Sequence, residues 1–324
     1  MRSALGGRRS PEPMECTRKN EFEQRSQREG DCMQTTRKAD PSTKIIMLGT
    51  GAPGPDPDRS GPATAIVVND TPYLIDFGPG VVRRVAAAYR NGITAFGFGG
   101  VKLTTVFLTH LHADHTAGYP DLMLTPWIMG RKKPLEIYGP KGLRAMTKHV
   151  AKAWEIDIAN RINGAEKLGA AGGRVNVHEI KSGLIYKDSN IAVTAFPTRH
   201  GEMKDTFAYR FETIDRTIVI SGDTAPTEAM VKNSLDCDVL IHEAYSQETC
   251  RQVSRKWQTY RRKHHTSSSE LATLANRTKP ALLVLYHRAN PGGIGLPNPE
   301  QVLLHEIRRT YKGEVVTGHD LDVF

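Results

Sequence analysis

The stretch that decides the fold is THLHADHTAG, residues 109–118, in which three histidines and one aspartate fall within six positions. It directly follows the apolar run TVFL at 105–108, which predicts a buried strand that ends where the cluster begins. Neutral imidazoles and carboxylates suit zinc, and a strand-to-helix turn can hold them while leaving room for water. We interpret the motif as a site for two cations rather than a His-rich surface loop, because it follows a buried strand. The candidate ligands are His110, His112, Asp114 and His115.

Further candidate ligands follow later strands. Four side chains cannot saturate two cations, so a two-metal site needs additional ligands. His200 follows the apolar run at 191–196, Asp223 lies in VISGDT, and His287 ends LLVLYH. Taken singly, each histidine fits a satisfied core position, and Asp223 fits a helix cap. Taken together and in this order, the three residues favour ligation at one rim of a sheet.

Hydrophobic patterning predicts an α/β fold. Strands are expected at 44–49, 64–69, 72–78, 104–108, 174–180, 191–196, 206–212, 216–221, 238–243, 281–286 and 314–317. Helices are expected at 81–89, 117–129, 225–234, 267–277 and 298–310. This alternation implies two mixed sheets packed face to face with helices outside, a four-layer αβ/βα sandwich.

Composition bounds the domain organisation and the partners. Of 324 residues, 39% are hydrophobic, which is enough for one large core. Residues 1–42 are polar and are expected to form a disordered arm before a folded domain at 43–324. A net charge of +9, from 44 basic and 35 acidic residues, favours anionic substrates. With no apolar run long enough to span a membrane, no secretory signal and four scattered cysteines, we expect a cytoplasmic enzyme with free thiols.

The order HxHxDH followed by single His, Asp and His residues resembles the metallo-β-lactamase superfamily across residues 44–324. The resemblance implies the metallo-β-lactamase fold and two Zn²⁺ ions per chain. One ion would be held by His110, His112 and His200, the other by Asp114, His115 and His287, with Asp223 as the bridge. Such a pair would generate an attacking hydroxide that Asp114 orients or deprotonates, without a protein nucleophile. A homodimer is also expected, because symmetric dimers are common in that superfamily.

Four segments are similar to the ribonuclease Z branch of that superfamily: MLGTGAPGPDPDRSGPATAIVV at 47–68, LIDFGPG at 74–80, IHEAYSQET at 241–249 and HHTSSSELATLA at 264–275. The similarity implies that Asp76 hydrogen-bonds a ligand imidazole. It also implies that Glu243 and His265 form a pair that donates a proton to the leaving oxygen of a phosphodiester. Ordinary alternatives are a strand-end surface carboxylate for Glu243 and a helix N-terminal residue for His265.

Departures from that branch leave the substrate open. Residues 139–175 contain a helical pattern in place of a Gly-Pro-rich arm, and LYHRANPG at 285–292 alters the pocket rim. We therefore expect the substrate to be RNA or a small anionic ester, such as an aryl sulfate or a cyclic nucleotide, with a lactone or a halogenated aromatic as further candidates. The basic stretch at 251–264, with Trp257 and Tyr260, could bind RNA or form a solvated helix face, and is expected to cover the pocket. A non-catalytic metal-binding scaffold is the alternative of another class.

Overall fold

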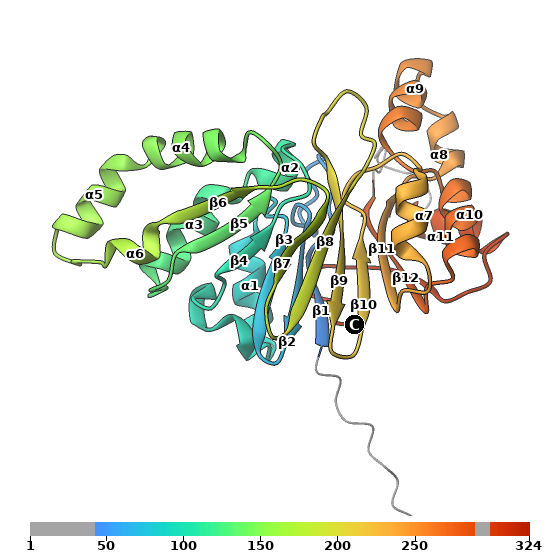
Figure 1. The fold of residues 1–324 in the computed structure, drawn as a ribbon. Coiled ribbons are helices and arrows are strands. Elements are labelled where there is room, and N and C mark those ends of the chain that lie inside the picture. Colours follow the sequence, from blue (N-terminus) through green and yellow to red (C-terminus); the bar gives the residue numbers. More distant parts are fainter. Residues whose placement is uncertain (1–42, 289–298) are drawn as a thin grey trace, which may run out of the picture. The chain divides into compact units, whose positions relative to one another are not determined.

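Two mixed β-sheets lie face to face at the centre of the fold, with helices on their outer faces (Figure 1). The computed structural model describes residues 43–288 and 299–324, all within one unit that spans Asp40–Phe324. The predicted four-layer α/β sandwich is confirmed. The arm expected at 1–42 lies outside the described residues.

The first sheet has six strands in chain order. They are β1 (Thr43–Gly49), β2 (Ala63–Val68), β3 (Thr71–Ile75), β4 (Thr105–Phe107), β5 (Leu135–Gly139) and β6 (Val175–Glu179). The pairs β1–β2 and β2–β3 are antiparallel, and the remaining pairs are parallel. Helical segments connect these strands: α1 (Val81–Arg90), η1 (Thr94–Phe96), η2 (Phe98–Gly100), α2 (Ala113–Thr116), α3 (Tyr119–Ile128), α4 (Leu143–Ala153), α5 (Glu155–Asn163) and α6 (Ala170–Gly173).

The second sheet has seven strands in the order β13-β12-β11-β10-β9-β8-β7. They are β7 (Gly183–Lys187), β8 (Ile191–Pro197), β9 (Phe207–Thr213), β10 (Thr217–Ile220), β11 (Val239–Ala244), β12 (Leu282–Arg288) and β13 (Val315–Thr317). The helices of this half are α7 (Glu228–Ser234), α8 (Gln247–Arg251), α9 (Arg255–His264), α10 (Ser268–Thr278) and α11 (Pro299–Arg308). Because β8 and β9, and β9 and β10, pair antiparallel while β10 to β12 pair parallel, the carboxyl ends of β8, β10 and β12 share one edge.

Aromatic packing fills the space between the sheets. Phe107 of β4 lies 5.5 Å from the ring centroid of Tyr138 in its own sheet and 5.5 Å from that of Phe211 in the other. Separate apolar clusters join the outer face of each sheet to its helices, for example Val81 and Leu122 on one side and Leu271 and Ile307 on the other. Burial of these side chains stabilises all four layers.

Several predicted elements differ from the structure. Strands β5 and β7 were not predicted. No residue of β7, a largely exposed edge strand, is fully buried, whereas the alternating burial of β5 shows that a period-two pattern was available in the sequence. The helix expected at 117–129 begins at Tyr119, since the proline at position 120 cannot continue an earlier helix. The helical pattern after 139 is split into α4 and α5 at Trp154, whose φ and ψ of −106° and 16° are not helical. Within the described ranges, no helix has both the length and the apolar character needed to cross a membrane.

Candidate metal centre

The opening motif forms the turn between β4 and α2. His110 follows β4 at its carboxyl end, and the extended residue His112 is the N-cap of α2, with φ −65° and ψ 150°. Asp114 and His115 belong to the single turn of α2. This short turn presents four side chains from six positions toward the edge where β8, β10 and β12 end.

The first group of converging side chains contains His110, His112 and His200. Nδ1 of His112 lies 3.1 Å from Nε2 of His110 and 3.0 Å from Nε2 of His200. The other nitrogen of the His200 ring, Nδ1, donates a hydrogen bond to the carbonyl oxygen of His264 at 2.8 Å. In the neutral ring, Nε2 of His200 therefore carries a lone pair. Lone pairs that face one another at this distance fit a shared cation.

Burial keeps this first group in the form that binds metal. It lowers the pKa of His110 well below its ordinary value, and it lowers the pKa of His200 to about 4. Both side chains are 1% exposed. Neutral imidazole is the state required of a metal ligand.

A second group contains Asp114, His115 and His287, and Asp223 lies between the two groups. Nε2 of His287 is 3.0 Å from Oδ2 of Asp114. Oδ1 of Asp223 lies 3.4 Å from Nε2 of both His115 and His287. Its Oδ2 lies 3.7 Å from Nε2 of His200 and 3.9 Å from Nε2 of His110. Asp223 therefore offers one oxygen to each group.

Unpaired buried atoms support the same interpretation. Nε2 of His115 and Oδ1 of Asp223 have no hydrogen-bond partner among the described residues. Buried polar atoms without partners are costly, and a cation between them would satisfy both. Burial opposes the ionisation of Asp223, but the facing imidazoles of His287 and His115 hold the pKa of its carboxyl well below its usual range. The donor set thus fits a metal ion.

Asp76 orients two of the imidazoles from behind. Its Oδ2 accepts a hydrogen bond from Nδ1 of His115 at 2.8 Å, and its Oδ1 accepts the backbone N–H of Thr109 at 2.8 Å. The hydroxyl of Thr109 donates to the same carboxylate and lies 3.0 Å from Nδ1 of His110. Asp76 also has a φ of 58°, in the left-handed region. One buried carboxylate therefore sets the tautomers of two candidate ligands.

A β-bulge aims His287 at the centre. Glu243 of β11 pairs with Tyr286 of β12, but Ala244 pairs with Arg288, so His287 is the extra residue. Its φ is 43°, a strained conformation for a residue other than glycine. A bulge redirects the side chain of the unpaired residue, and here the side chain is fully buried beside Asp114.

Glu243 and His265 form a buried pair beside the second group. Nδ1 of His265 donates to Oε1 of Glu243 at 3.2 Å, and the same oxygen accepts the backbone N–H groups of Thr224 and Thr266 at 3.2 and 3.1 Å. Burial lowers the pKa of His265, but the Glu243 charge and hydrogen bond outweigh it and raise the pKa to about 9. Ser267, the N-cap of α10, forms a capping box with Glu270 and holds this segment in place.

The structure brings every predicted site residue into one cluster. One ring nitrogen of His265 also lies within 4.8 Å of ligand atoms of Asp223 and His287. Two contributors were not predicted. Thr109 links Asp76 to His110, and the backbone carbonyl of His264 accepts the His200 hydrogen bond. Because every residue has a backbone carbonyl, residue type at position 264 offers no signal for the second of these contacts.

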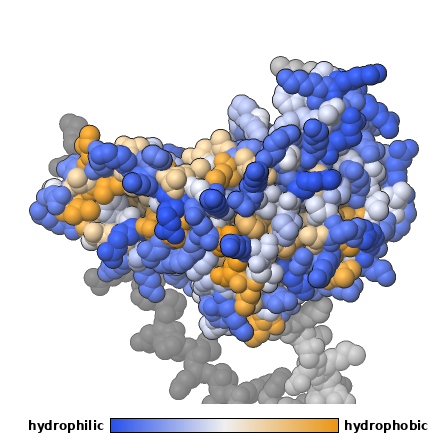
Figure 2. Space-filling view, turned by 45° about the horizontal axis from the view of Figure 1, so that its top comes forward, coloured by the Kyte–Doolittle hydropathy of each residue, from blue (hydrophilic) through white to orange (hydrophobic). Residues whose placement is uncertain are grey.

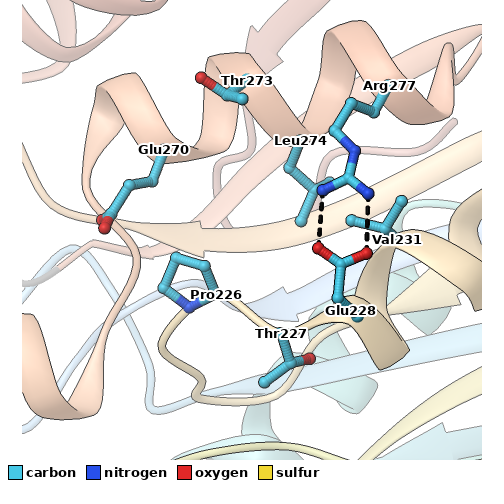
Figure 3. Close-up of a pocket in the computed structure, with 8 residues that line it drawn as sticks. All are labelled: Pro226, Thr227, Glu228, Val231, Glu270, Thr273, Leu274 and Arg277. Atoms are coloured by element: carbon cyan, nitrogen blue, oxygen red, sulfur yellow. Dashed lines mark hydrogen bonds and ion pairs between the residues drawn. The ribbon is translucent and has the colours of Figure 1, made fainter.

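Surface grooves lie apart from this cluster. One groove of about 290 Å³ lies between α7 and α10 and is crossed by an ion pair from Arg277 to Glu228, with distances of 2.8 and 2.7 Å (Figure 3). Exposed pairs of this kind contribute little stability. Another groove, of about 400 Å³, is lined by α3 to α6 and β6 around Trp127. No candidate ligand lines either groove. The candidate metal centre is therefore identified from its converging ligand side chains and not from a surface groove.

Comparison with known proteins places the chain in a family. Residues 71–288 match the family model described as a beta-lactamase superfamily domain. Ribonuclease Z of Mycobacterium bovis is 31% identical over 281 residues, covering 86% of this chain and 96% of that protein. The crystal structure of human tRNase Z, short form, covers 87% of this chain and 98% of its own at a TM-score of 0.60 and 23% identity. The crystal structure of the metallo-beta-lactamase fold protein YhfI from Bacillus subtilis also covers 87% of this chain and 98% of its own, at a TM-score of 0.64 and 18% identity. Both solved structures have the same fold as this chain. The chain therefore belongs to the metallo-β-lactamase superfamily, in its ribonuclease Z-like branch.

Proposed function

We propose that the protein is a dinuclear zinc hydrolase that cleaves phosphodiesters in the manner its ribonuclease Z relatives suggest. The observation that carries this proposal is the convergence of two ligand groups on Asp223, with the Glu243–His265 pair alongside. A ligand set used only to stabilise the fold would not need a buried proton donor next to it. The pair therefore favours catalysis over a metal-binding scaffold.

The two groups divide the candidate ligands between two ions. His110, His112 and His200 would hold one zinc, Asp114, His115 and His287 the other, and Asp223 would bridge them. Five imidazoles with two carboxylates suit zinc better than a carboxylate-rich di-iron site. When bound, such a pair of ions acidifies water and neutralises charge on the attacked phosphate.

The chain's own residues move the protons. Asp114, whose side chain is 10% exposed, would orient the attacking water and accept its proton. The water oxygen bonds to phosphorus while the bond from phosphorus to the leaving oxygen breaks. His265 would donate a proton to that oxygen, because the Glu243 carboxylate accepts its Nδ1 hydrogen bond and favours the protonated imidazole. The products are a phosphomonoester and an alcohol.

A metal assay and a substrate panel test the proposal. We expect about two zinc ions per chain by atomic emission and hydrolysis of bis(p-nitrophenyl) phosphate, both lost in Asp223→Ala. Precursor tRNA, cyclic nucleotides, aryl sulfates and lactones complete the panel and identify the substrate class. Less than one metal ion per chain with no hydrolysis of any substrate would favour the scaffold alternative.

We also propose a homodimer, because symmetric dimers are the commonest soluble oligomers, and a cytoplasmic location. Light scattering of the purified chain at several concentrations tests the first, since a stable dimer keeps twice the mass of the chain on dilution. A fluorescent fusion tests the second. Either a monomer or a membrane-bound fusion protein would contradict the corresponding proposal.

A further inference from the structure

An aromatic ladder runs along one face of α9. Trp257, Tyr260 and His264 are spaced by three and four residues, so their side chains share a helix face. The rings of Tyr260 and His264 stack at 3.9 Å and 16°, and Trp257 meets Tyr260 edge-on at 5.4 Å. Exposure falls from 53% at Trp257 to 37% at Tyr260 and 7% at His264. The ladder therefore leads from the surface inward.

The inner end of the ladder contacts the candidate centre. The His264 ring lies 5.2 Å from the ring of His200, and the Tyr260 ring lies 6.0 Å from that of His265. Burial raises the pKa of Tyr260, and the carboxylates of Asp223 and Asp114 raise it further. This electrostatic coupling agrees with a phenol near the reacting groups.

The ladder is held rigidly in place. Nδ1 of His264 donates to the backbone carbonyl of Tyr260 at 2.8 Å, and its Nε2 lies 3.3 Å from Glu202. The absence of a side chain at Gly201 allows the His264 ring to lie close to His200. A Cβ at Gly201 would lie 1.8 Å from Nε2 of His264, and its φ is 57°. A platform that is already ordered loses little entropy when a ring stacks on it.

Positive charge predominates in the segment that carries the ladder, with the Glu202 carboxylate beside its inner end. Between Thr249 and Ser269 the sequence has no acidic residue, and its cations are Arg251, Arg255, Lys256, Arg261, Arg262 and Lys263. Arg261 is buried and lies over the ring of Tyr245, whereas the other five are exposed. Hydrophilic residues dominate the upper right of the surface in Figure 2, the region where α9 lies in Figure 1. Exposed aromatic rings among cations suit a strand of bases and phosphates.

We propose that Trp257 and Tyr260, supported from the inner side by His264, form a stacking subsite for the nucleobase on the leaving side of the scissile phosphodiester in single-stranded RNA. The side follows from His265, which must reach the leaving oxygen and lies beside the inner end of the ladder. A base joined through its ribose to that oxygen is then next to Tyr260. This inference rests on the proposed function, and it adds the residues that bind the base on the leaving side.

A dinucleotide series tests the subsite in the zinc-loaded enzyme. The substrates are a dinucleoside monophosphate and its two analogues that each lack one base. The variants are Trp257→Ala, Tyr260→Ala and Tyr260→Phe. The matched control is Trp154→Ala, which removes a 40% exposed tryptophan between α4 and α5. We expect either alanine variant to raise KM about 5- to 150-fold with little change in kcat, and Tyr260→Phe to retain most of the binding.

The analogue without the leaving-side base decides the outcome. The unmodified enzyme should already have a raised KM for this analogue, because the analogue lacks the base that stacks. The alanine variants should not raise that KM further, since the stacking contact they remove is already absent. Equal effects of the variants on substrates with and without that base would overturn the subsite and leave α9 with a packing role only.

A binding measurement separates this inference from the proposed function. Fluorescence anisotropy of a labelled single-stranded hexaribonucleotide with the metal-free protein requires no turnover. Weaker binding by the alanine variants, and no such difference for an abasic hexamer, supports stacking even if no phosphodiester is cleaved. Active enzyme with unchanged hexamer affinity in Trp257→Ala and Tyr260→Ala would refute the subsite while the hydrolase proposal stands.

Discussion

Replacement of Asp76 by Asn tests how one carboxylate prepares the metal centre. Asn has the same size and tolerates the left-handed φ of 58° at this position, so the backbone conformation is retained. Thr109 can still donate its backbone N–H to the amide oxygen. The amide nitrogen, however, would then face the Nδ1 proton of His115, where the carboxylate accepts a hydrogen bond at 2.8 Å. Two donors would meet in a fully buried site.

The mismatch has a predictable cost in metal affinity. His115 can avoid it only by moving its proton to Nε2, the nitrogen that lies 3.4 Å from Asp223 and would bind metal. Losing the partner behind a ligand imidazole lowers metal affinity about 10- to 100-fold. That loss corresponds to about 1.4–2.7 kcal/mol of binding free energy.

Competition with a chromophoric zinc chelator measures this loss, with stoichiometry from atomic emission. Asp188→Asn is the matched control, because Asp188 accepts hydrogen bonds from the hydroxyls of Tyr73 and Tyr186 at 2.6 and 2.8 Å at the β7–β8 hairpin. We expect both variants to unfold at lower denaturant concentration and only Asp76→Asn to bind zinc more weakly. Unchanged zinc affinity in folded Asp76→Asn would refute the tautomer argument.

Further predictions address the acid pair, the core, the α9 contact and the metal. His265→Ala should slow hydrolysis of alkyl phosphodiesters about 10²- to 10⁴-fold while p-nitrophenyl esters, which need no proton, change little; equal losses on both would contradict its role. Phe107→Ala should reduce the free energy of unfolding by about 3–5 kcal/mol in urea titrations, because its ring packs in both sheets. Gly201→Ala should displace His264 and destabilise the fold by about 1–3 kcal/mol, with weaker hexaribonucleotide binding. Free zinc at 100 times its Kd should stabilise the protein by about 2.7 kcal/mol for each zinc site, which calorimetry with and without chelator would detect.

The fold class and the candidate ligands could be inferred from local patterns. An apolar run before HLHADH predicts a strand that delivers ligands to a turn, and the single residues at later strand ends complete the set. Those signals are short-range, since period and spacing depend only on near neighbours along the chain. Strand β7, which was not predicted, is largely exposed and depends on its pairing with β8.

The contacts between segments far apart in the sequence are seen only in the tertiary structure. Asp76 reaches His115 across 39 positions, and His287 is aimed by a bulge whose register depends on β11. His264 becomes part of the centre because Gly201 lets α9 approach His200. Residue type and spacing limit which groups are available for catalysis. Hydrogen-bond geometry between separate elements, which no local pattern contains, selects the tautomers and the direction in which each group points.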